Sequence, residues 1–162
     1  MVFGFGKGKL YLTIDRDIYQ PGEHITGKVD LQLKKHYSAR DLTVRLLGQE
    51  VTRRQVRDSN GRYRTQESRR TFCDESVHLG GEGEYQIGQW PFQLPIPTDA
   101  LQRVARSGGA IGGLMAFGDA MSGRRIEWFV KGQLDLPMKL DVSDKKYISI
   151  RGRDGVDGQV RI

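Results

Sequence analysis

Cysteine is almost missing from this chain of 162 residues, which contains Cys73 alone. A single cysteine excludes an internal disulfide and every metal site that needs several thiolates. A chain of this length buries roughly 70% of its unfolded surface, so it can fold without cross-links or metal. A composition so poor in cysteine suits a reducing compartment. We therefore expect one domain over residues 1–162, located in the cytoplasm.

Long apolar runs are missing as well. No segment approaches the roughly 20 apolar residues of a transmembrane helix. Residues 1–8 (MVFGFGKG) lack the apolar stretch of a secretory signal. We expect no transmembrane segment, while peripheral contact with a membrane stays open.

Signatures of catalysis are scarce too. His24, His36 and His78 stand in separate segments, and no local pattern pairs Cys73 or a serine with one of them. Gly4-x-Gly6-x-Gly8 precedes a strand pattern instead of following one, so it lacks the context of a dinucleotide loop, and no Walker sequence occurs. The sequence therefore predicts no catalytic residues, no cofactor and no metal site.

What the chain does contain is a series of short strand patterns. At the Pro21-Gly22 corner, proline sets φ for the first turn position and glycine accepts the positive φ of a type II turn. Residues 24–33 then alternate apolar and polar, which is typical of a strand with one buried and one wet face. Similar patterns cover residues 9–15, 41–47, 73–79, 84–94, 126–136 and 145–151. This spacing predicts an all-β antiparallel sandwich of about eight strands.

Residues 51–72 are predicted to form a long, charged hairpin. Asn60-Gly61 at its centre predicts a type I′ turn. The arms have almost no apolar face, so we expect them to project beyond the sandwich into solvent. Residues 53–70 contain seven arginines and only two acidic residues, Asp58 and Glu67, which gives these 18 residues a net charge of +5. The net charge of the whole chain is +6. The seven are Arg53, Arg54, Arg57, Arg62, Arg64, Arg69 and Arg70.

Residues 98–125 depart from the strand pattern. Thr98 is placed to cap a short helix, and glycines follow it. We expect this insertion to be partly helical or mobile, because a structureless connection of such length is uncommon in a compact domain. It serves either as a lid over one end of the sandwich or as a docking element. The apolar residues concerned are Leu114, Met115 and Phe117. Residues 152–162 are expected to stay loose or to add one short strand.

Five motifs follow one another along the chain. They are Tyr19-x-Pro21-Gly22-Glu23, Ile25-x-Gly27-x-Val29, Leu42-x-Val44-x-Leu46-x-Gly48, Phe92-x-Leu94-Pro95 and Trp128-x-Val130-x-x-x-Leu134-Asp135-x-Pro137. In this order they resemble the N-terminal domain of arrestins, and the sporulation-control-protein-like members are most similar in style. The resemblance covers about residues 2–151 apart from the insertion. It implies an immunoglobulin-like β-sandwich used as an adaptor or scaffold, without catalysis. Arrestins proper pair two such sandwiches, so their phosphate-release switch does not carry over to a single domain.

The arginine-rich hairpin is the strongest candidate for a binding site. Guanidinium groups pair bidentately with phosphate or carboxylate, and a cluster of them attracts anionic partners. We expect a protein partner, acidic or phosphorylated, and self-association through exposed strand edges stays open. One alternative is a solvated hairpin whose arginines keep the protein soluble. Another is nucleic-acid binding through phosphates, for which Tyr63 is the single aromatic residue among residues 53–70.

Overall fold

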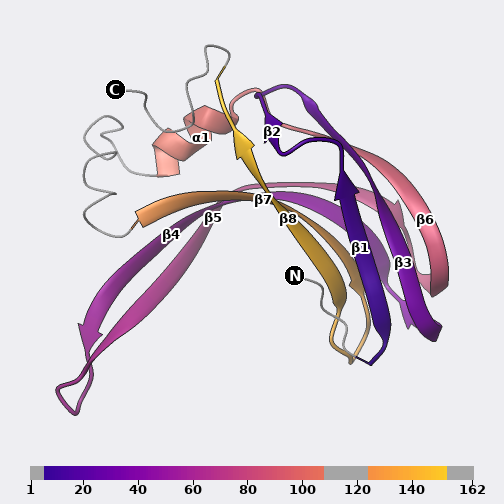
Figure 1. Cartoon of the computed structure of the whole chain (residues 1–162), viewed down its shortest axis with the longest axis horizontal. Coiled ribbons are helices and arrows are strands. Elements are labelled where there is room, and N and C mark those ends of the chain that lie inside the picture. Colours follow the sequence, from indigo (N-terminus) through magenta and orange to yellow (C-terminus); the bar gives the residue numbers. More distant parts are fainter. Residues whose placement is uncertain (1–5, 108–123, 153–162) are drawn as a thin grey trace.

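The structure, a computed structural model, is a two-layer β-sandwich and describes residues 6–107 and 124–152 (Figure 1). The first sheet has the strand order β1-β3-β6 and contains β1 (Gly8–Ile14), β3 (His24–Ala39) and β6 (Gly83–Pro95). The second has the order β2-β8-β7-β4-β5 and contains β2 (Ile18–Tyr19), β8 (Val142–Ile150), β7 (Arg124–Asp135), β4 (Asp41–Arg57) and β5 (Tyr63–Gly80). The predicted sandwich of eight strands is confirmed; the one parallel pairing among the described strands is β2 with β8.

Alternating apolar residues of both sheets form the core. The period of two in β1 and β3 places its apolar side chains on one face, as the sequence predicts. The fully buried core residues include Leu10, Ile25, Val29, Leu31, Val44, Leu46, Leu94, Val130 and Leu134. Trp128 joins them and packs edge-to-face on Phe72, with ring centroids 5.3 Å apart. Gly132 allows the sheets to approach, since a Cβ there would lie 3.2 Å from the side chain of Leu10.

The Pro21-Gly22 corner is a type II turn, as predicted. Gly22 has a φ of 87°, and the N–H of Glu23 donates to the carbonyl of Gln20 at 3.2 Å. Ile96, at the exit of β6, exchanges backbone hydrogen bonds with Gly22 and Glu23 at 3.0 and 2.8 Å. These hydrogen bonds tie the corner to the end of β6, an edge strand of the three-stranded sheet.

Tyr19 locks this corner from the other side. Its side chain is 1% exposed, and its hydroxyl donates to Asp15 Oδ1 at 2.5 Å while accepting the N–H of Arg16 at 3.1 Å. The Arg16 guanidinium lies 4.7 Å from the centre of the Tyr19 ring. The carbonyl of Tyr19 accepts the N–H of Arg151 at 2.9 Å, so the same residue joins the second sheet. The first of the five motifs is therefore a connection between the two layers.

A buried carboxylate protects the outer edge of β1. Asp144 of β8 is 3% exposed, and its Oδ2 accepts the N–H of Leu12 at 3.0 Å while its Oδ1 accepts the N–H of Lys145 at 2.9 Å. An unpaired strand edge otherwise invites pairing with another chain. The sequence pattern gave no indication of this contact, because the two residues lie 132 positions apart.

Two boundaries differ from the prediction. β3 continues through residues 34–38, beyond the strand predicted over residues 24–33, because Tyr37 resumes pairing with Tyr85 after a register shift that begins at Gln32. The helix α1 (Ala100–Ser107) confirms the partly helical insertion, but its cap is Asp99 and not Thr98. The carbonyl of Asp99 accepts the first helical hydrogen bond, from Arg103 N at 3.0 Å.

Some expectations lie outside the described residues. Leu114, Met115 and Phe117 are among them, as is the possible short strand within residues 153–162. The described part of the chain contains no helix long and apolar enough to cross a membrane.

Removal of the Tyr19 hydroxyl is expected to weaken the corner. Burial raises the pKa of Asp15, but the hydrogen bonds from Tyr19 and from the backbone of Thr26 outweigh this effect and the net pKa is lowered. Tyr19→Phe should therefore reduce the free energy of unfolding by about 1 kcal/mol at pH 7. A lowered carboxyl pKa stabilises the fold above the unfolded value of 3.8, and this contribution is lost as the pH falls through the folded value. The difference between the variant and the wild type should accordingly shrink near pH 3.

Urea unfolding at both pH values, followed by tryptophan fluorescence, measures this difference. Tyr37→Phe is the matched control, since no hydrogen bond forms at the Tyr37 hydroxyl within the described chain. Equal stability of Tyr19→Phe and the wild type at pH 7 would contradict the assignment.

Candidate functional site

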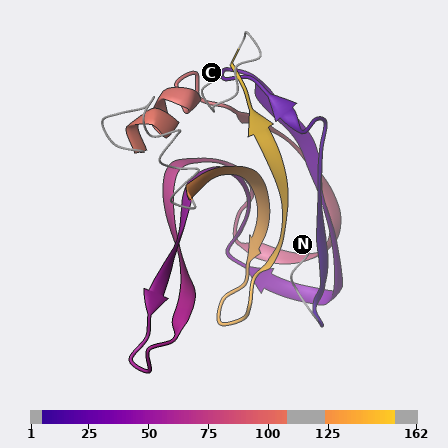
Figure 2. The ribbon, with the colours of Figure 1, turned by 60° about the vertical axis from the view of Figure 1, so that its left-hand side comes forward.

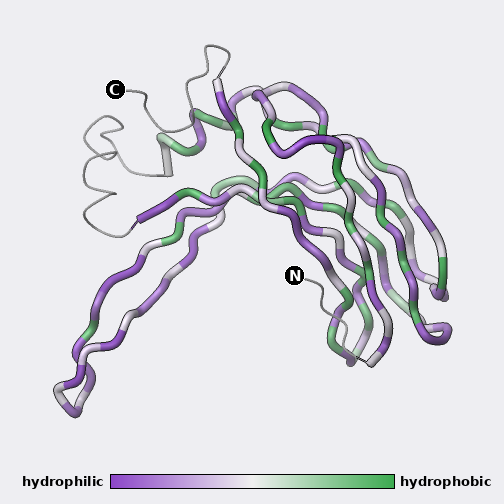
Figure 3. The backbone as a smooth tube through the Cα atoms, viewed as in Figure 1, coloured by the Kyte–Doolittle hydropathy of each residue, from purple (hydrophilic) through white to green (hydrophobic). Residues whose placement is uncertain are grey.

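The arms of β4 and β5 extend well beyond the sandwich as a single hairpin (Figures 1 and 2). Val51 is fully buried, whereas every residue of the opposite arm from Tyr63 to Thr71 is exposed. The arms are also mostly hydrophilic (Figure 3). The prediction that they project into solvent is confirmed.

The turn at the tip of the hairpin differs from the predicted type I′. A type I′ turn requires positive φ at two consecutive residues, and within the hairpin only Gly61 has it, at 79°. The reason is Asp58, whose Oδ1 accepts the N–H groups of Asn60 and Arg62, each at 2.9 Å. The Gly61 N–H donates to the Asp58 carbonyl at 3.0 Å, which leaves glycine in the left-handed position after the turn. A local side-chain acceptor thus lengthens the loop.

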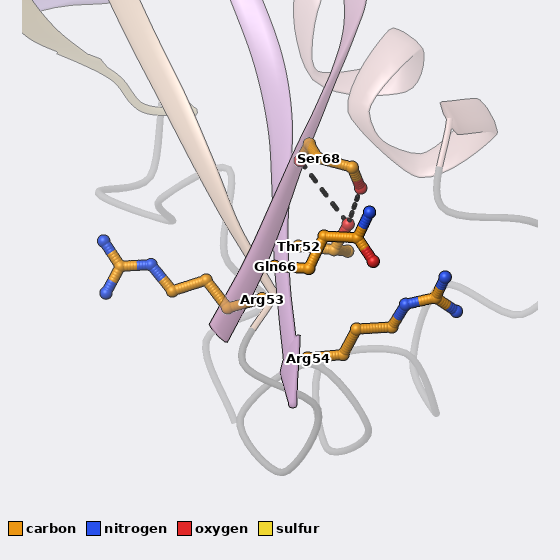
Figure 4. Close-up of a pocket in the computed structure, with 5 residues that line it drawn as sticks. All are labelled: Thr52, Arg53, Arg54, Gln66 and Ser68. Carbon is orange, nitrogen blue, oxygen red and sulfur yellow. Dashed lines mark hydrogen bonds between the residues drawn. The ribbon is translucent and has the colours of Figure 1, made fainter. Parts of the chain in front are cut away.

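Strand alternation divides six of the seven arginines between two faces. Residues directly opposite each other in an antiparallel pair lie on the same face. One face, here called the network face, carries Val51, Arg53, Gln55, Arg57, Tyr63, Thr65, Glu67 and Arg69. The other, the open face, carries Glu50, Thr52, Arg54, Val56, Arg64, Gln66, Ser68 and Arg70. In Figure 4 Arg53 points away from Arg54 and Gln66, in agreement with this division. Arg62 belongs to the turn.

Carboxylates neutralise much of the network face. Glu67 accepts hydrogen bonds from Arg53 Nε and Arg69 Nη2, both at 2.8 Å. Glu127, from the neighbouring strand β7, accepts from Arg69 Nη1 and Arg125 Nε, again at 2.8 Å. Three strands are therefore tied together at the base of the hairpin.

These contacts set the protonation of the two carboxyl groups. The hydrogen bond from Arg53, with that from Arg69, holds the pKa of Glu67 below its usual value. Burial raises the pKa of Glu127, but donation from Arg69 and Arg125 outweighs it and the net pKa is lowered. Both groups therefore stay ionised at neutral pH, and the network keeps its charges.

The open face keeps its positive charge. Within the described chain, Arg54, Arg64 and Arg70 form no ion pair. Glu50, at the base of the same face, is engaged by Arg124 at 2.9 Å. Three guanidinium groups thus stand on one face without a neutralising carboxylate.

Hydroxyl and amide groups lie between these arginines. Thr52 and Ser68 share a hydrogen bond of 2.6 Å across the arms. With Arg53, Arg54 and Gln66 they line a surface hollow of about 450 Å³ (Figure 4). The hollow therefore offers guanidinium, hydroxyl and amide groups to an anionic ligand.

Sequence reasoning named all seven arginines but treated them as one set. It missed Glu127 and Arg125, because their place beside the hairpin depends on the register of β7 with β4. The pairing of Gln49 with Glu127 settles that register. At the tip, Arg57 lies 6.0 Å from the centre of the Tyr63 ring. In residues 6–107 and 124–152, no group of three or more His, Cys, Asp or Glu side chains gathers that could hold a metal ion.

Loss of the Glu127 carboxylate is expected to loosen the base of the hairpin. Glu127→Gln removes the negative charge and one of the two oxygens that accept from Arg69 and Arg125, in a side chain only 15% exposed. We expect a loss of about 1 kcal/mol in the free energy of unfolding at pH 7. Because the pKa of Glu127 is lowered, its contribution is present above the unfolded value of 4.5 and disappears as the pH falls through the folded value.

Urea unfolding at pH 7 and pH 3 checks this expectation. Glu82→Gln removes the same charge from an exposed turn where no ion pair forms among the described residues, and it should change nothing. A pH-independent loss in Glu127→Gln would contradict the ionic origin of the effect.

Comparison with known proteins agrees with this architecture. The family model for the arrestin (or S-antigen) N-terminal domain matches residues 9–153. No curated protein matches the chain. Among solved structures, Spo0M, a sporulation control protein from Bacillus subtilis, is similar in fold, with 21% sequence identity and a TM-score of 0.55. The match covers 90% of this chain and 50% of that one, so this chain spans about half the length of Spo0M. From the motifs, the sandwich and the family match together, the chain belongs to the family of the arrestin N-terminal domain.

Proposed function

We propose that this protein is a non-catalytic adaptor that binds an acidic or phosphorylated protein partner through the open face of the hairpin. The observation that supports this role is the contrast between the two faces. Arg53 and Arg69 are held by carboxylates, whereas Arg54, Arg64 and Arg70 form no ion pair within the described chain. Three positive charges without a paired carboxylate, on one face of a projecting hairpin, exceed what solubility requires.

The chemistry of the open face suits oxyanions. Each guanidinium presents a planar fork of donors that matches phosphate and carboxylate. The donors of Thr52, Gln66 and Ser68 lie among the arginines and add hydrogen-bonding capacity. The network on the opposite face holds the two arms in register, so less freedom is lost when a partner binds.

A protein partner is favoured over nucleic acid by the position of the one aromatic ring. Tyr63 is 69% exposed, but it pairs with Arg57 on the network face. The open face therefore carries no aromatic residue on which bases could stack. Carboxylate or phosphate groups of a peptide need only the arginine forks. Duplex DNA, which presents phosphates alone, is the competitor that an experiment must include.

Location in the cytoplasm and self-association remain predictions. β5 and β6 are the outer strands of the two sheets on one side of the sandwich, so a second copy has an edge to approach there. The arginines of the β5 arm oppose such pairing by charge repulsion.

Removal of charge from the open face is expected to weaken the binding of an acidic ligand. The variant Arg54→Gln/Arg64→Gln/Arg70→Gln is compared with Arg53→Gln/Arg57→Gln/Arg69→Gln, which loses three charges from the network face. Titration with a Glu-rich peptide, with the same peptide phosphorylated on serine, and with duplex DNA is performed across a salt series. We expect the first variant to bind the peptides more weakly by about 2–3 kcal/mol. The second variant should lose much less.

Three results would overturn the proposal. One is equal loss in the two variants, since net charge alone would then explain binding. Another is no binding of either peptide by the wild type. The third is duplex DNA bound more tightly than both peptides, with loss in the first variant, which would favour the nucleic-acid alternative.

A further inference from the structure

The turn between β7 and β8 presents apolar side chains directly to water. Met138 is 101% exposed and Leu140 is 83% exposed, the two highest values among the large hydrophobic residues of the described chain. The turn that carries them, here called the tip, lies at one end of the sandwich, beside the start of β1 (Figure 1). Isolated exposed apolar residues are ordinary, but here two of them share one turn.

The backbone conformation at Met138 is also unfavourable for a residue with a side chain. Met138 has a φ of 57°, the only positive value at a non-glycine residue in the described chain. Pro137 precedes it, and the N–H of Lys139 approaches the Leu136 carbonyl at 3.4 Å, as in a type II turn. Glycine is the usual residue at this position of a type II turn. Methionine therefore combines an unfavourable conformation with full exposure, and such local conflicts concentrate at functional sites.

Lysines surround the two apolar side chains. The Nζ atoms of Lys139 and Lys35 lie 4.8 and 5.3 Å from the centre of the same ring, that of Tyr37. Lys7 Nζ donates to the carbonyl of Leu140 at 2.7 Å. Lys34 is exposed next to Lys35, and its N–H donates to the Lys7 carbonyl at 2.9 Å. Three ammonium groups, those of Lys7, Lys35 and Lys139, thus lie at the tip and come from three segments of the chain.

The nearby carboxylates do not neutralise these lysines. Asp141 turns back into the turn, where its oxygens accept the N–H of Leu136 at 3.0 Å and the side-chain amide of Gln133. Asp135 lies 3.7 Å from Arg40. The tip therefore keeps an excess of positive charge around an apolar centre.

We propose that this tip, formed by Met138, Leu140 and the lysines Lys7, Lys35 and Lys139, docks on the surface of an anionic lipid bilayer. Exposed apolar side chains on a turn can enter the boundary between headgroups and acyl chains without a preformed pocket. Lysines around them are attracted to anionic headgroups. A protein partner would have to supply a fitted pocket for these two side chains, whereas a bilayer accepts them without one.

This site is separate from the hairpin. The pairing of Asp41 with Asp135 places the tip at one end of β4, and the hairpin turn lies at the other end. The inference does not depend on the proposed adaptor role. Together, the two sites would allow a membrane-bound molecule to keep its hairpin free.

The test is co-sedimentation of the full chain with vesicles of phosphatidylcholine alone and with vesicles that also contain phosphatidylglycerol. We expect binding only to the anionic vesicles. Met138→Ser/Leu140→Ser should lower the partition coefficient about tenfold or more. Lys139→Gln should lower it about fivefold, the effect of one charge near the surface. The matched controls are Tyr63→Ser, an exposed ring elsewhere, and Lys28→Gln, an exposed lysine on β3; neither should change binding.

A fluorescent label identifies which end touches the membrane. An environment-sensitive dye is attached to cysteine in Met138→Cys or in Tyr63→Cys; the native Cys73 is buried and should stay unlabelled. A blue shift at position 138, with none at position 63, supports the inference. Retention of the blue shift at position 138 in the Arg54→Gln/Arg64→Gln/Arg70→Gln variant would show that the hairpin is not responsible for membrane binding. No binding to anionic vesicles, a shift at position 63 alone, or unchanged binding by the folded Met138→Ser/Leu140→Ser variant would overturn it.

Discussion

The hydroxyl of Tyr19 holds together the corner at which the chain crosses from one sheet to the other. It donates to Asp15 at the end of β1 and accepts from Arg16, while the Tyr19 carbonyl accepts from Arg151 after β8. Burial and the hydrogen bond to the Asp15 carboxylate raise the pKa of Tyr19 to about 12, so the hydroxyl keeps its proton throughout the physiological range. These contacts fix the corner between β1 and β2, which belong to different sheets, and the hairpin extends from the second of these sheets.

The hairpin receives its own stiffness from a second set of contacts. A long pair of strands without an apolar face gains little from burial, so hydrogen bonds and ion pairs must keep it straight. Glu67 and Glu127 supply these on one face and leave the arginines of the opposite face unengaged. Stability and recognition are thus assigned to opposite sides of the same two strands. The β7–β8 tip shows a different combination, in which exposed apolar residues are framed by lysines.

Much of the fold could be predicted from local patterns. The alternation after Pro21-Gly22 and the spacing of the later strands indicate a sandwich because each strand must bury one face. The projecting hairpin follows from arms without apolar residues. The prediction of a type I′ turn was wrong because the Asp58 side chain accepts hydrogen bonds from backbone N–H groups of the turn. The extension of β3 was missed because polar residues remain in a strand when a partner such as Tyr85 is available.

Strand alternation alone divides the arginines between the two faces, but the full neutralisation of one face could not be predicted, because it depends on a contact between distant segments. Asp144 reaches Leu12, and Glu127 reaches Arg69, only after the strands have taken their registers. A count of charges along the chain therefore overstates the positive charge available on the network face. It also does not show which face of the hairpin keeps its charge. Exposure of Met138 is equally invisible in the sequence, where Pro137 marks only the end of a strand.

The central claim is that the arginines of the open face, and not those of the network face, meet the partner. NMR signals of the Arg Nε–Hε groups test it most directly, during titration with an acidic peptide phosphorylated on serine. The account predicts shifts for Arg54, Arg64 and Arg70, with those of Arg53 and Arg69 nearly unchanged. Equal shifts at all five, or shifts confined to Arg53 and Arg69, would contradict it.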